Sequence, residues 1–194
     1  MFLKIMAGTI TREEGTLLIN DLARENFAES IKELAYLIDN PPSGVFPKTI
    51  LHTIALSRNK AFNNLLISSL EHKNEGVSIL AASELGRLRT EDAKRVLIDH
   101  LNSDVYHVRQ ASSSALTEFP DGFEILNKHI LTHKEPFYRV TSAQALLKAG
   151  KKGMDALLSI LSSGNSGAIT TVVAVIVKSP ASIEAGDIPK IFDA

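Results

Sequence analysis

Apolar and small residues recur along this chain in four segments that align without gaps. The segments begin at Val77, Val108, Tyr138 and Ala168, which are 31, 30 and 30 residues apart. Within each segment the first, fifth, eighth or ninth, and twelfth positions are mostly apolar or small. This spacing marks one stripe of an amphipathic α-helix and differs from the alternation of a strand. The pattern therefore predicts helices at equivalent positions of four repeats.

A second series of helices follows the first at the same interval. We expect these helices over residues 92–101, 122–131 and 152–161, with residues 61–70 as an earlier copy. A helix over residues 46–57 should precede that copy, with Pro47 in its first turn, where a missing N–H costs little. Turn-forming residues separate the helices, and connections this short make neighbouring helices antiparallel.

The two ends of the chain follow the pattern more loosely. Residues 11–25 and 27–40 predict a further helix pair, and a short last helix is expected within 182–192, interrupted by Pro189. Residues 170–177 are rich in Val, Ile and Thr, which favour strands. The repeat register predicts a helix there instead, because packing overrides propensity. The chain is thus expected to form one all-α solenoid of about six helix pairs, at approximately 11–40, 45–73, 75–103, 105–134, 136–164 and 166–194.

The residue types suit such a stack, because a single helix pair cannot bury its apolar stripe alone. Small residues allow close approach of the helices, and leucines fill the space between layers. Replacing one of these leucines by alanine should cost about 2–5 kcal/mol. The small residues are Ala81, Ala82, Ala111, Ala143 and Ala145, and the leucines are Leu101, Leu131 and Leu161.

The segments at Val77, Val108 and Tyr138 resemble the V-R-x-x-A-x-x-A-L-G-x-L helix of HEAT-like repeats, of the phycobilisome-lyase type. This resemblance implies a right-handed α-α superhelix over residues 1–194. Arg109 and Arg139 stand at the arginine position of the pattern, and Asp104 and Glu135 stand where the family commonly has an acidic partner. The outer two copies lack the arginine, so any ladder of Asp–Arg pairs is broken at both ends. We expect the two arginines to fix stacking geometry.

The resemblance also implies that the second helix of each pair lines a concave surface. Equivalent polar residues of successive repeats then form columns, with about 10 Å between neighbouring members. Such a surface suits an extended peptide or the edge of a protein. A helix face that is merely solvated has the same composition, so this alternative stays open. Ile125 and Ser162 complete these columns. The residues predicted to bind a protein are Asn64, Ser68, Glu71, Arg95, Asp99, Asn102, His129, Thr132, Asp155 and Ser159.

Composition narrows the class of protein. The formal net charge of −1 argues against a dedicated nucleic-acid binder, which usually carries a basic excess. With no cysteine, disulfides and thiolate metal sites are impossible. The longest apolar stretch is about half of the ~20 residues that a membrane span needs, and the first residues lack the features of a signal peptide. We therefore expect a soluble cytoplasmic protein, a monomer or a weak homodimer formed through an uncapped end.

Catalytic and cofactor motifs are missing from the sequence: it contains no P-loop, no G-x-G-x-x-G and no G-x-S-x-G. His129 and His133 lie four apart on one helix, but without a carboxylate motif they are expected to be surface histidines. No catalytic residue, metal or cofactor is therefore predicted, and the chain is expected not to be an enzyme.

The leading hypothesis for function is a non-catalytic adaptor that binds another protein or peptide. The resemblance provides an alternative, a bilin lyase or other chromophore-handling protein, and a lesser one, a DNA-binding HEAT-like protein. Two enzymes with similar repeats fit poorly: a di-iron deoxyhypusine hydroxylase should have His-Glu dipeptides, and an alkylpurine glycosylase should have a cationic groove with aromatic residues. This chain has no His-Glu dipeptide and no tryptophan.

Overall fold

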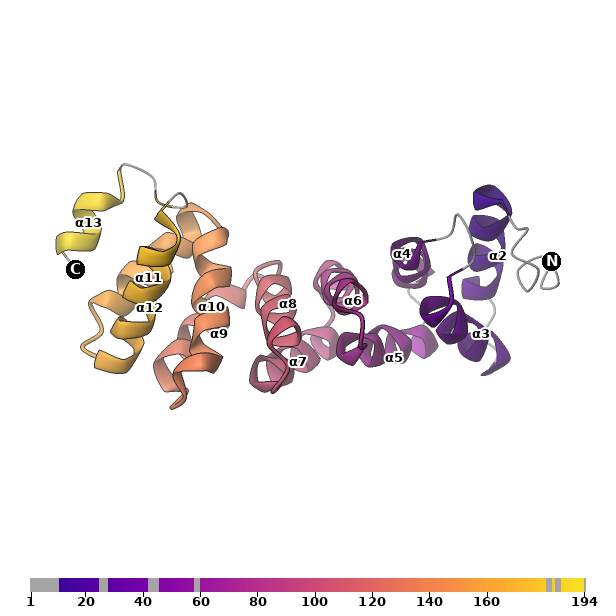
Figure 1. The fold of residues 1–194 in the computed structure, drawn as a ribbon, viewed down its shortest axis with the longest axis horizontal. Coiled ribbons are helices and arrows are strands. Elements are labelled where there is room, and N and C mark those ends of the chain that lie inside the picture. The colour runs from indigo at the N-terminus through magenta and orange to yellow at the C-terminus, as the bar shows by residue number, and fades with distance from the viewer. Residues whose placement is uncertain are drawn as a thin grey trace. The chain divides into compact units, whose positions relative to one another are not determined.

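The computed structural model describes residues 11–24, 28–41, 46–57, 60–180, 183 and 186–193, and the regular secondary structure of these residues is helical throughout (Figure 1). The predicted all-α fold is confirmed. The chain forms two compact units, Met1–Leu88 and Arg89–Ala194. The boundary divides the predicted repeat at 75–103. A single solenoid over 1–194 and its right-handed superhelix stay predictions.

The first unit is built around helix α4, which packs against α2, α3, α5 and α6. Pro47 is the first residue of α4, as predicted, because that position needs no intrahelical N–H donor. The side chains of Leu34, Ile50, Phe62 and Leu66 are fully buried between these helices. The elements of this unit are α2 (Arg12–Arg24), α3 (Ala28–Asp39), α4 (Pro47–Ser57), α5 (Lys60–Ser68), η1 (Ser69–Glu71) and α6 (Glu75–Leu88).

The second unit is centred on helix α10, which packs against α8, α9, α11 and α12. Neighbours on several sides explain why small and polar residues of α10, such as Thr141, Ser142 and Ala143, are completely buried. The elements of this unit are α7 (Glu91–Asp99), η2 (His100–Asn102), α8 (Tyr106–Leu116), α9 (Gly122–Thr132), α10 (Pro136–Lys148), α11 (Lys151–Leu161), α12 (Ser166–Lys178) and α13 (Ile188–Asp193).

Helix α12 confirms that the repeat register outweighs strand propensity. Ala168, Val172, Val175 and Ile176 are buried at helical spacing along it. Asn165 caps the helix: its Oδ1 accepts a hydrogen bond from the N–H of Ala168 at 3.1 Å, while its Nδ2 donates to the Leu131 carbonyl at 2.9 Å. One side chain therefore starts this helix and ties it to the end of α9, so that packing compensates for the β-branched residues.

The connections that follow the second helices share one local device. A side chain at the start of each connection accepts a hydrogen bond from the backbone N–H two residues later, at 2.9–3.2 Å. The acceptors are His72, Ser103, His133 and Ser163, which alternate between imidazole Nδ1 and hydroxyl Oγ along the chain. These contacts hold the entry into the next helix. His72 and His133 therefore have structural roles in their turns.

Two glycines allow close helix approach rather than a special backbone conformation. A Cβ atom on Gly122 would lie 1.8 Å from the Leu116 carbonyl oxygen, and one on Gly153 would lie 1.8 Å from that of Leu146. Each glycine thus lets the second helix of a pair begin against the backbone of the first. Gly150, which precedes α11, has instead a positive φ of 70° and turns the chain.

The end of the chain differs from the prediction at Pro189. This residue lies in the first turn of α13 and does not interrupt the helix. Backbone N–H groups in the first turn have no carbonyl partner within the helix, so the missing N–H of a proline costs nothing there. Residues 182, 184 and 185 of the predicted last helix lie outside the described residues. None of the helices in the described part of the chain combines the length and apolar character of a membrane span.

Candidate functional site

The polar residues predicted to bind a partner lie on the second helices, as expected. In the first unit, Asn64, Ser68 and Glu71 are exposed on α5 and η1. In the second unit all are exposed except one: His129 on α9 is partly buried. The exposed members are Arg95, Asp99, Asn102, Thr132, Asp155 and Ser159, together with Ser162. Binding of a partner to this face stays a prediction.

Several of these side chains already have local partners. Arg95 forms an ion pair with Asp92 on its own helix, and Asp155 accepts a hydrogen bond from the Lys151 ammonium at 3.1 Å. Exposed ion pairs of this kind contribute about 0–1 kcal/mol. Ser159 has a different role, because its Oγ accepts from Asn127 Nδ2 at 2.9 Å and so links α11 to α9. The polar face therefore combines solvated pairs with contacts between repeats.

His129 links three elements of the second unit. Its Nδ1 lies 2.9 Å from the Ser142 hydroxyl on α10, and its Nε2 lies 3.2 Å from Asn102 Oδ1 on η2. Burial, and secondarily the nearby His133, lowers the pKa of His129 to about 4. The ring is therefore neutral at pH 7, donating to the amide oxygen and accepting from the hydroxyl. Both ring nitrogens are thus engaged in contacts between helices, and among the described residues no group of three or more His, Asp or Glu is placed to hold a metal ion.

The sequence did not predict a cluster of aromatic side chains around Arg109. The guanidinium Cζ lies 5.7 Å from the ring centroid of Tyr106, 5.3 Å from that of Phe137 and 5.2 Å from that of Tyr138. Arg109 itself is only 5% exposed. The rings come from the first turns of α8 and α10, so one buried cation joins two successive repeats. We call Tyr106, Phe137 and Tyr138 the aromatic platform.

Hydrogen bonds and stacking hold the rings of the aromatic platform in place. The Tyr106 hydroxyl donates to Gln144 Oε1 at 3.1 Å, and the Tyr138 hydroxyl donates to Asp104 Oδ1 at 2.8 Å. The bond to the Asp104 carboxylate raises the pKa of Tyr138, which keeps this phenol protonated. Phe137 lies against Tyr138, with ring centroids 4.0 Å apart and ring planes tilted by 36°. These contacts fix the orientation of the three rings in the chain itself.

The arginines and acidic residues do not form the pairs that the resemblance implied. Asp104 is engaged by Tyr138, and Arg109 Nη1 donates instead to the Ser103 carbonyl at 2.7 Å. Arg139 is 7% exposed and lies against α12, where a Cβ on Gly167 would come 2.7 Å from its Nη1. Their burial between helices agrees with a structural role in stacking. The aromatic rings, which the family pattern does not specify, take the place of an acidic neighbour.

The outer side of the aromatic platform is an exposed apolar surface. Tyr106 is 48% exposed and Phe137 is 49% exposed, and the adjoining Val105 is 45% exposed. Val105 occupies the N-cap of α8, where its side chain makes no capping hydrogen bond. A polar N-cap would be worth about 1 kcal/mol, so a locally unfavourable, exposed residue lies beside the exposed rings. Departures from local rules of this kind are typical of functional surfaces.

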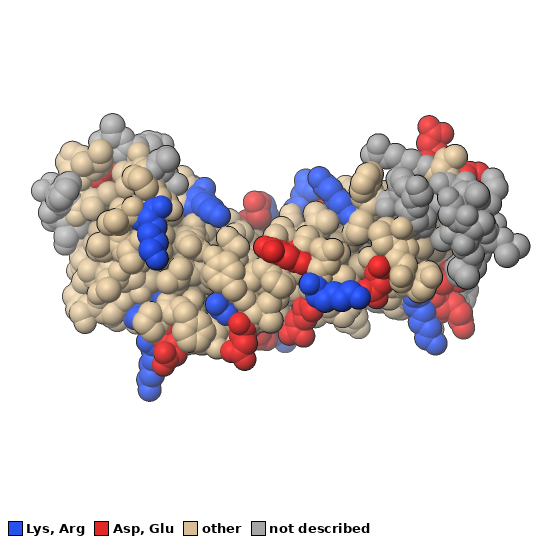
Figure 2. Space-filling view, viewed as in Figure 1, with Lys and Arg blue, Asp and Glu red and all other residues tan. Residues whose placement is uncertain are grey.

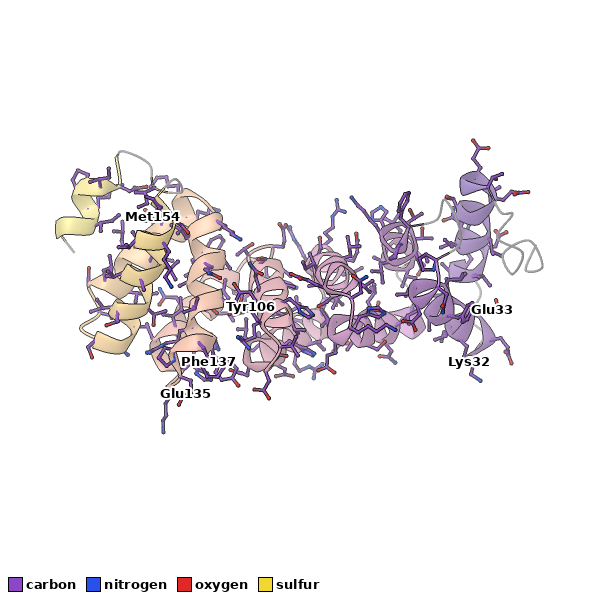
Figure 3. All side chains as sticks on the ribbon, viewed as in Figure 1. Lys32, Glu33, Tyr106, Glu135, Phe137 and Met154 are labelled. Atoms are coloured by element: carbon purple, nitrogen blue, oxygen red, sulfur yellow. The ribbon has the colours of Figure 1, made fainter. Side chains whose placement is uncertain are left out.

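The buried Arg109 charge disfavours a second cation placed directly on the rings of the aromatic platform. A positive charge on the outer side would lie about 10 Å from the Arg109 guanidinium and be repelled by roughly 2 kcal/mol at an effective dielectric constant of about 20. The gain from an exposed cation–π contact is only about 0.5–1 kcal/mol. Carboxylates lie at the rim instead, because Asp104 and Glu135 are exposed next to Val105 and Pro136. Figure 3 shows Glu135 and Phe137 at the same end of α10, and Tyr106 on α8.

Two other surface features bear less specific chemistry. In the first unit a hollow of about 590 Å³ lies between α4 and α6, with Phe46, Pro47, Val77 and Leu80 among its walls. His52 also borders it and is turned toward the buried Glu84 carboxylate, 3.1 Å from its Nδ1. On the face shown in Figure 2, acidic and basic residues are interspersed rather than gathered into a field of one sign.

Comparison with known proteins agrees with the repeats. Residues 31–117 match the family model of HEAT repeats. A crystal structure described as that of an engineered protein is similar at 21% sequence identity and a TM-score of 0.37, with 92% of this chain and 95% of that chain covered. Among proteins with curated functions, no sequence matches this chain. The family match therefore indicates HEAT repeats over residues 31–117, a range whose described part is helical from α3 to α8.

Proposed function

We propose that this chain is a non-catalytic scaffold that binds another protein, and that the aromatic platform with Val105 is its main contact surface. The observation that carries the proposal is the exposure of about half of Tyr106 and of Phe137 on rings that are already fixed. Aromatic residues supply much of the energy of protein interfaces, and side chains that are ordered in advance lose little entropy on binding. A repeat architecture supports the proposal, since such folds commonly present extended binding surfaces.

The polar face of the second helices is the competing surface within the same function. Its members are exposed apart from His129, but several pair with a neighbour on their own helix, as Arg95 does, or are tied to a neighbouring helix, as Ser159 is. Polar residues in such positions contribute little at the rim of an interface. We therefore assign the larger share of the binding energy to the aromatic platform, and a supporting role to the polar face.

Site-specific photocrosslinking in the native host distinguishes the two surfaces. A photoreactive phenylalanine analogue is placed at Val105, beside the platform, or at Arg95, whose side chain is 70% exposed on α7. We expect a discrete crosslinked protein from Val105, identified by mass spectrometry, and loss of this product when Phe137→Ala is added. Val177→Ala is the matched control, since Val177 is an exposed apolar residue (71%) on α12. Crosslinks from Arg95 alone would transfer the function to the polar face, and none from either position would refute it.

Removing one exposed aromatic side chain should cost about 1–2 kcal/mol of binding free energy if the platform is central to the interface. This corresponds to a five- to thirty-fold rise in Kd at about 1.4 kcal/mol per factor of ten. The Tyr106→Ala and Phe137→Ala variants should both show this loss with unchanged circular dichroism, because neither residue belongs to the buried core.

A further inference from the structure

We infer that the aromatic platform recognises an extended, proline-containing segment, whose prolyl rings lie on Tyr106 and Phe137 and whose basic side chain faces Asp104 and Glu135. This inference rests on the proposed function and names the chemistry of its partner. Three properties of the surface lead to it: the position of the Arg109 charge, the rigidity of the rings, and the carboxylates at the rim.

The position of Arg109 favours an uncharged group on the rings. Its guanidinium lies within 5.7 Å of all three ring centroids and is buried beneath them. Arg109 thus already makes cation–π contacts with the buried side of the rings. A lysine or methylated amine on the exposed side would be repelled by its positive charge. Prolyl and aliphatic groups bring apolar area without charge. They fit the rings better than a cation does.

The rigidity of the rings favours a partner that is itself preformed. Tyr106 is held by Gln144 and Tyr138 by Asp104, and Phe137 lies in tilted contact with the ring of Tyr138. Proline-rich segments adopt the polyproline II conformation before they bind, and they dock on aromatic surfaces at low entropic cost. An amphipathic helix as partner would need a long apolar groove. The exposed apolar residues of this surface lie instead at the first turns of α8 and α10.

The rim determines the charge expected beside the prolines. Asp104 and Glu135 are both exposed, while the cation of the cluster, Arg109, is buried. Lys134, which precedes Glu135 in the sequence, is exposed as well. The exposed charges next to the platform residues are therefore two carboxylates and one ammonium group. A partner with Arg or Lys next to its prolines gains attraction there, and one with Glu loses it.

Three fluorescein-labelled peptides test the inference by anisotropy with the full chain. The first has nine prolines and two terminal arginines, the second replaces the prolines by Gly and Ser, and the third replaces the arginines by glutamates. We expect the first to bind with Kd in the micromolar to sub-millimolar range. The second should bind at least about ten-fold more weakly and the third about three-fold more weakly. Phe137→Ala and Tyr106→Ala should each weaken the first peptide about five-fold or more, and Val177→Ala should leave it unchanged.

The outcomes separate the inference from the function on which it rests. Equal binding of the Gly/Ser peptide would mean recognition of charge alone and would overturn the inference. The inference also fails if no peptide binds while photocrosslinking at Val105 still captures a protein at a segment without proline, and the proposed function then stands. Absence of crosslinks from both Val105 and Arg95 would remove both, whereas crosslinks from Arg95 alone would remove the inference and move the contact surface to the polar face. Tyr106→Phe, which keeps the ring and removes only the bond to Gln144, should weaken the first peptide less than Tyr106→Ala does.

Discussion

Acidification from pH 7 to pH 4 should destabilise this protein through His129. In the folded chain, burial and then His133 lower the pKa of His129 from 6.5 to about 4. The unfolded chain therefore takes up this proton near pH 6.5, whereas the folded chain does so only near pH 4. Because the unfolded state binds more protons between these values, the free energy of unfolding falls as the pH drops through the window.

The magnitude follows from the width of the window. A lowered pKa of this size corresponds to about 3.4 kcal/mol, at about 1.36 kcal/mol per pKa unit. Solvent reaches part of the ring, which reduces the expected contribution to roughly 2 kcal/mol. The loss should be complete near pH 4 and absent above about pH 7. Protonation also puts a hydrogen on the nitrogen that accepts from the Ser142 hydroxyl, so this contact must reorient.

Urea unfolding of the parent chain and of His129→Gln, followed by circular dichroism between pH 7.5 and 4, measures the effect. The difference in free energy of unfolding between the two proteins should change by roughly 2 kcal/mol across this range, because only the parent loses the His129 contribution. NMR titration of the ring protons reports the pKa of His129 directly. In His133→Gln that pKa should rise, since a like charge is removed. Parallel stability curves for the parent and His129→Gln would show that burial does not perturb this histidine.

Three further predictions concern packing and capping. Gly153→Ala should lower the free energy of unfolding by about 1–3 kcal/mol despite the better helix propensity of alanine, because its Cβ would collide with the Leu146 carbonyl. Thermal melts test this against Gly76→Ala, a helical glycine whose Cβ would approach only the Asn74 side chain. Equal melting temperatures of the two variants would contradict it. Leu101 is only 1% exposed, so Leu101→Ala should lower the free energy of unfolding, measured in urea, by about 2–5 kcal/mol. Leu131→Ala should lower it less, because Leu131 is only partly buried. The reverse order would be inconsistent with the packing. Val105→Asn should raise the free energy of unfolding by about 1 kcal/mol, because it adds a polar N-cap to α8, and should at the same time weaken peptide binding at the platform. A variant that is both more stable and binds the peptide more tightly would argue against a functional role for Val105.

The helices of the central repeats were accessible from the sequence because their signals are local. The in-phase apolar stripes located α6, α8, α10 and α12 to within a few residues, and the leucine ends located the second helices. Even α12, whose composition favours a strand, followed the register. The HEAT-repeat match extends to residue 31, and so includes most of α3, where the pattern was looser. The hydrogen-bonded turns at His72, Ser103, His133 and Ser163 also recur at the repeat interval, and this signal could have been found.

The candidate surface was only partly accessible from sequence. The polar faces of the second helices were predicted, and those residues are exposed apart from His129. The aromatic platform was missed, since Tyr106 lies about thirty residues from Phe137 and Tyr138 and the repeat alignment treated them as separate positions. A usable signal was present in the sequence: aromatic residues stand within three positions before the arginine in two successive repeats. The expected pair of Asp104 with Arg109 is absent, because Asp104 accepts from the Tyr138 hydroxyl and Arg109 donates to the Ser103 carbonyl.

The order of residues by itself determined the helical repeat, because helix periodicity, caps and turns depend on residues that are neighbours along the chain. The tertiary structure alone decided that Arg109 is enclosed by rings from α8 and α10, and that His129 is a neutral link between η2, α9 and α10. Both depend on which side chains of different repeats meet and how fully they exclude water. Those quantities arise only when the helices pack, and they are what give this stack of repeats a distinctive surface.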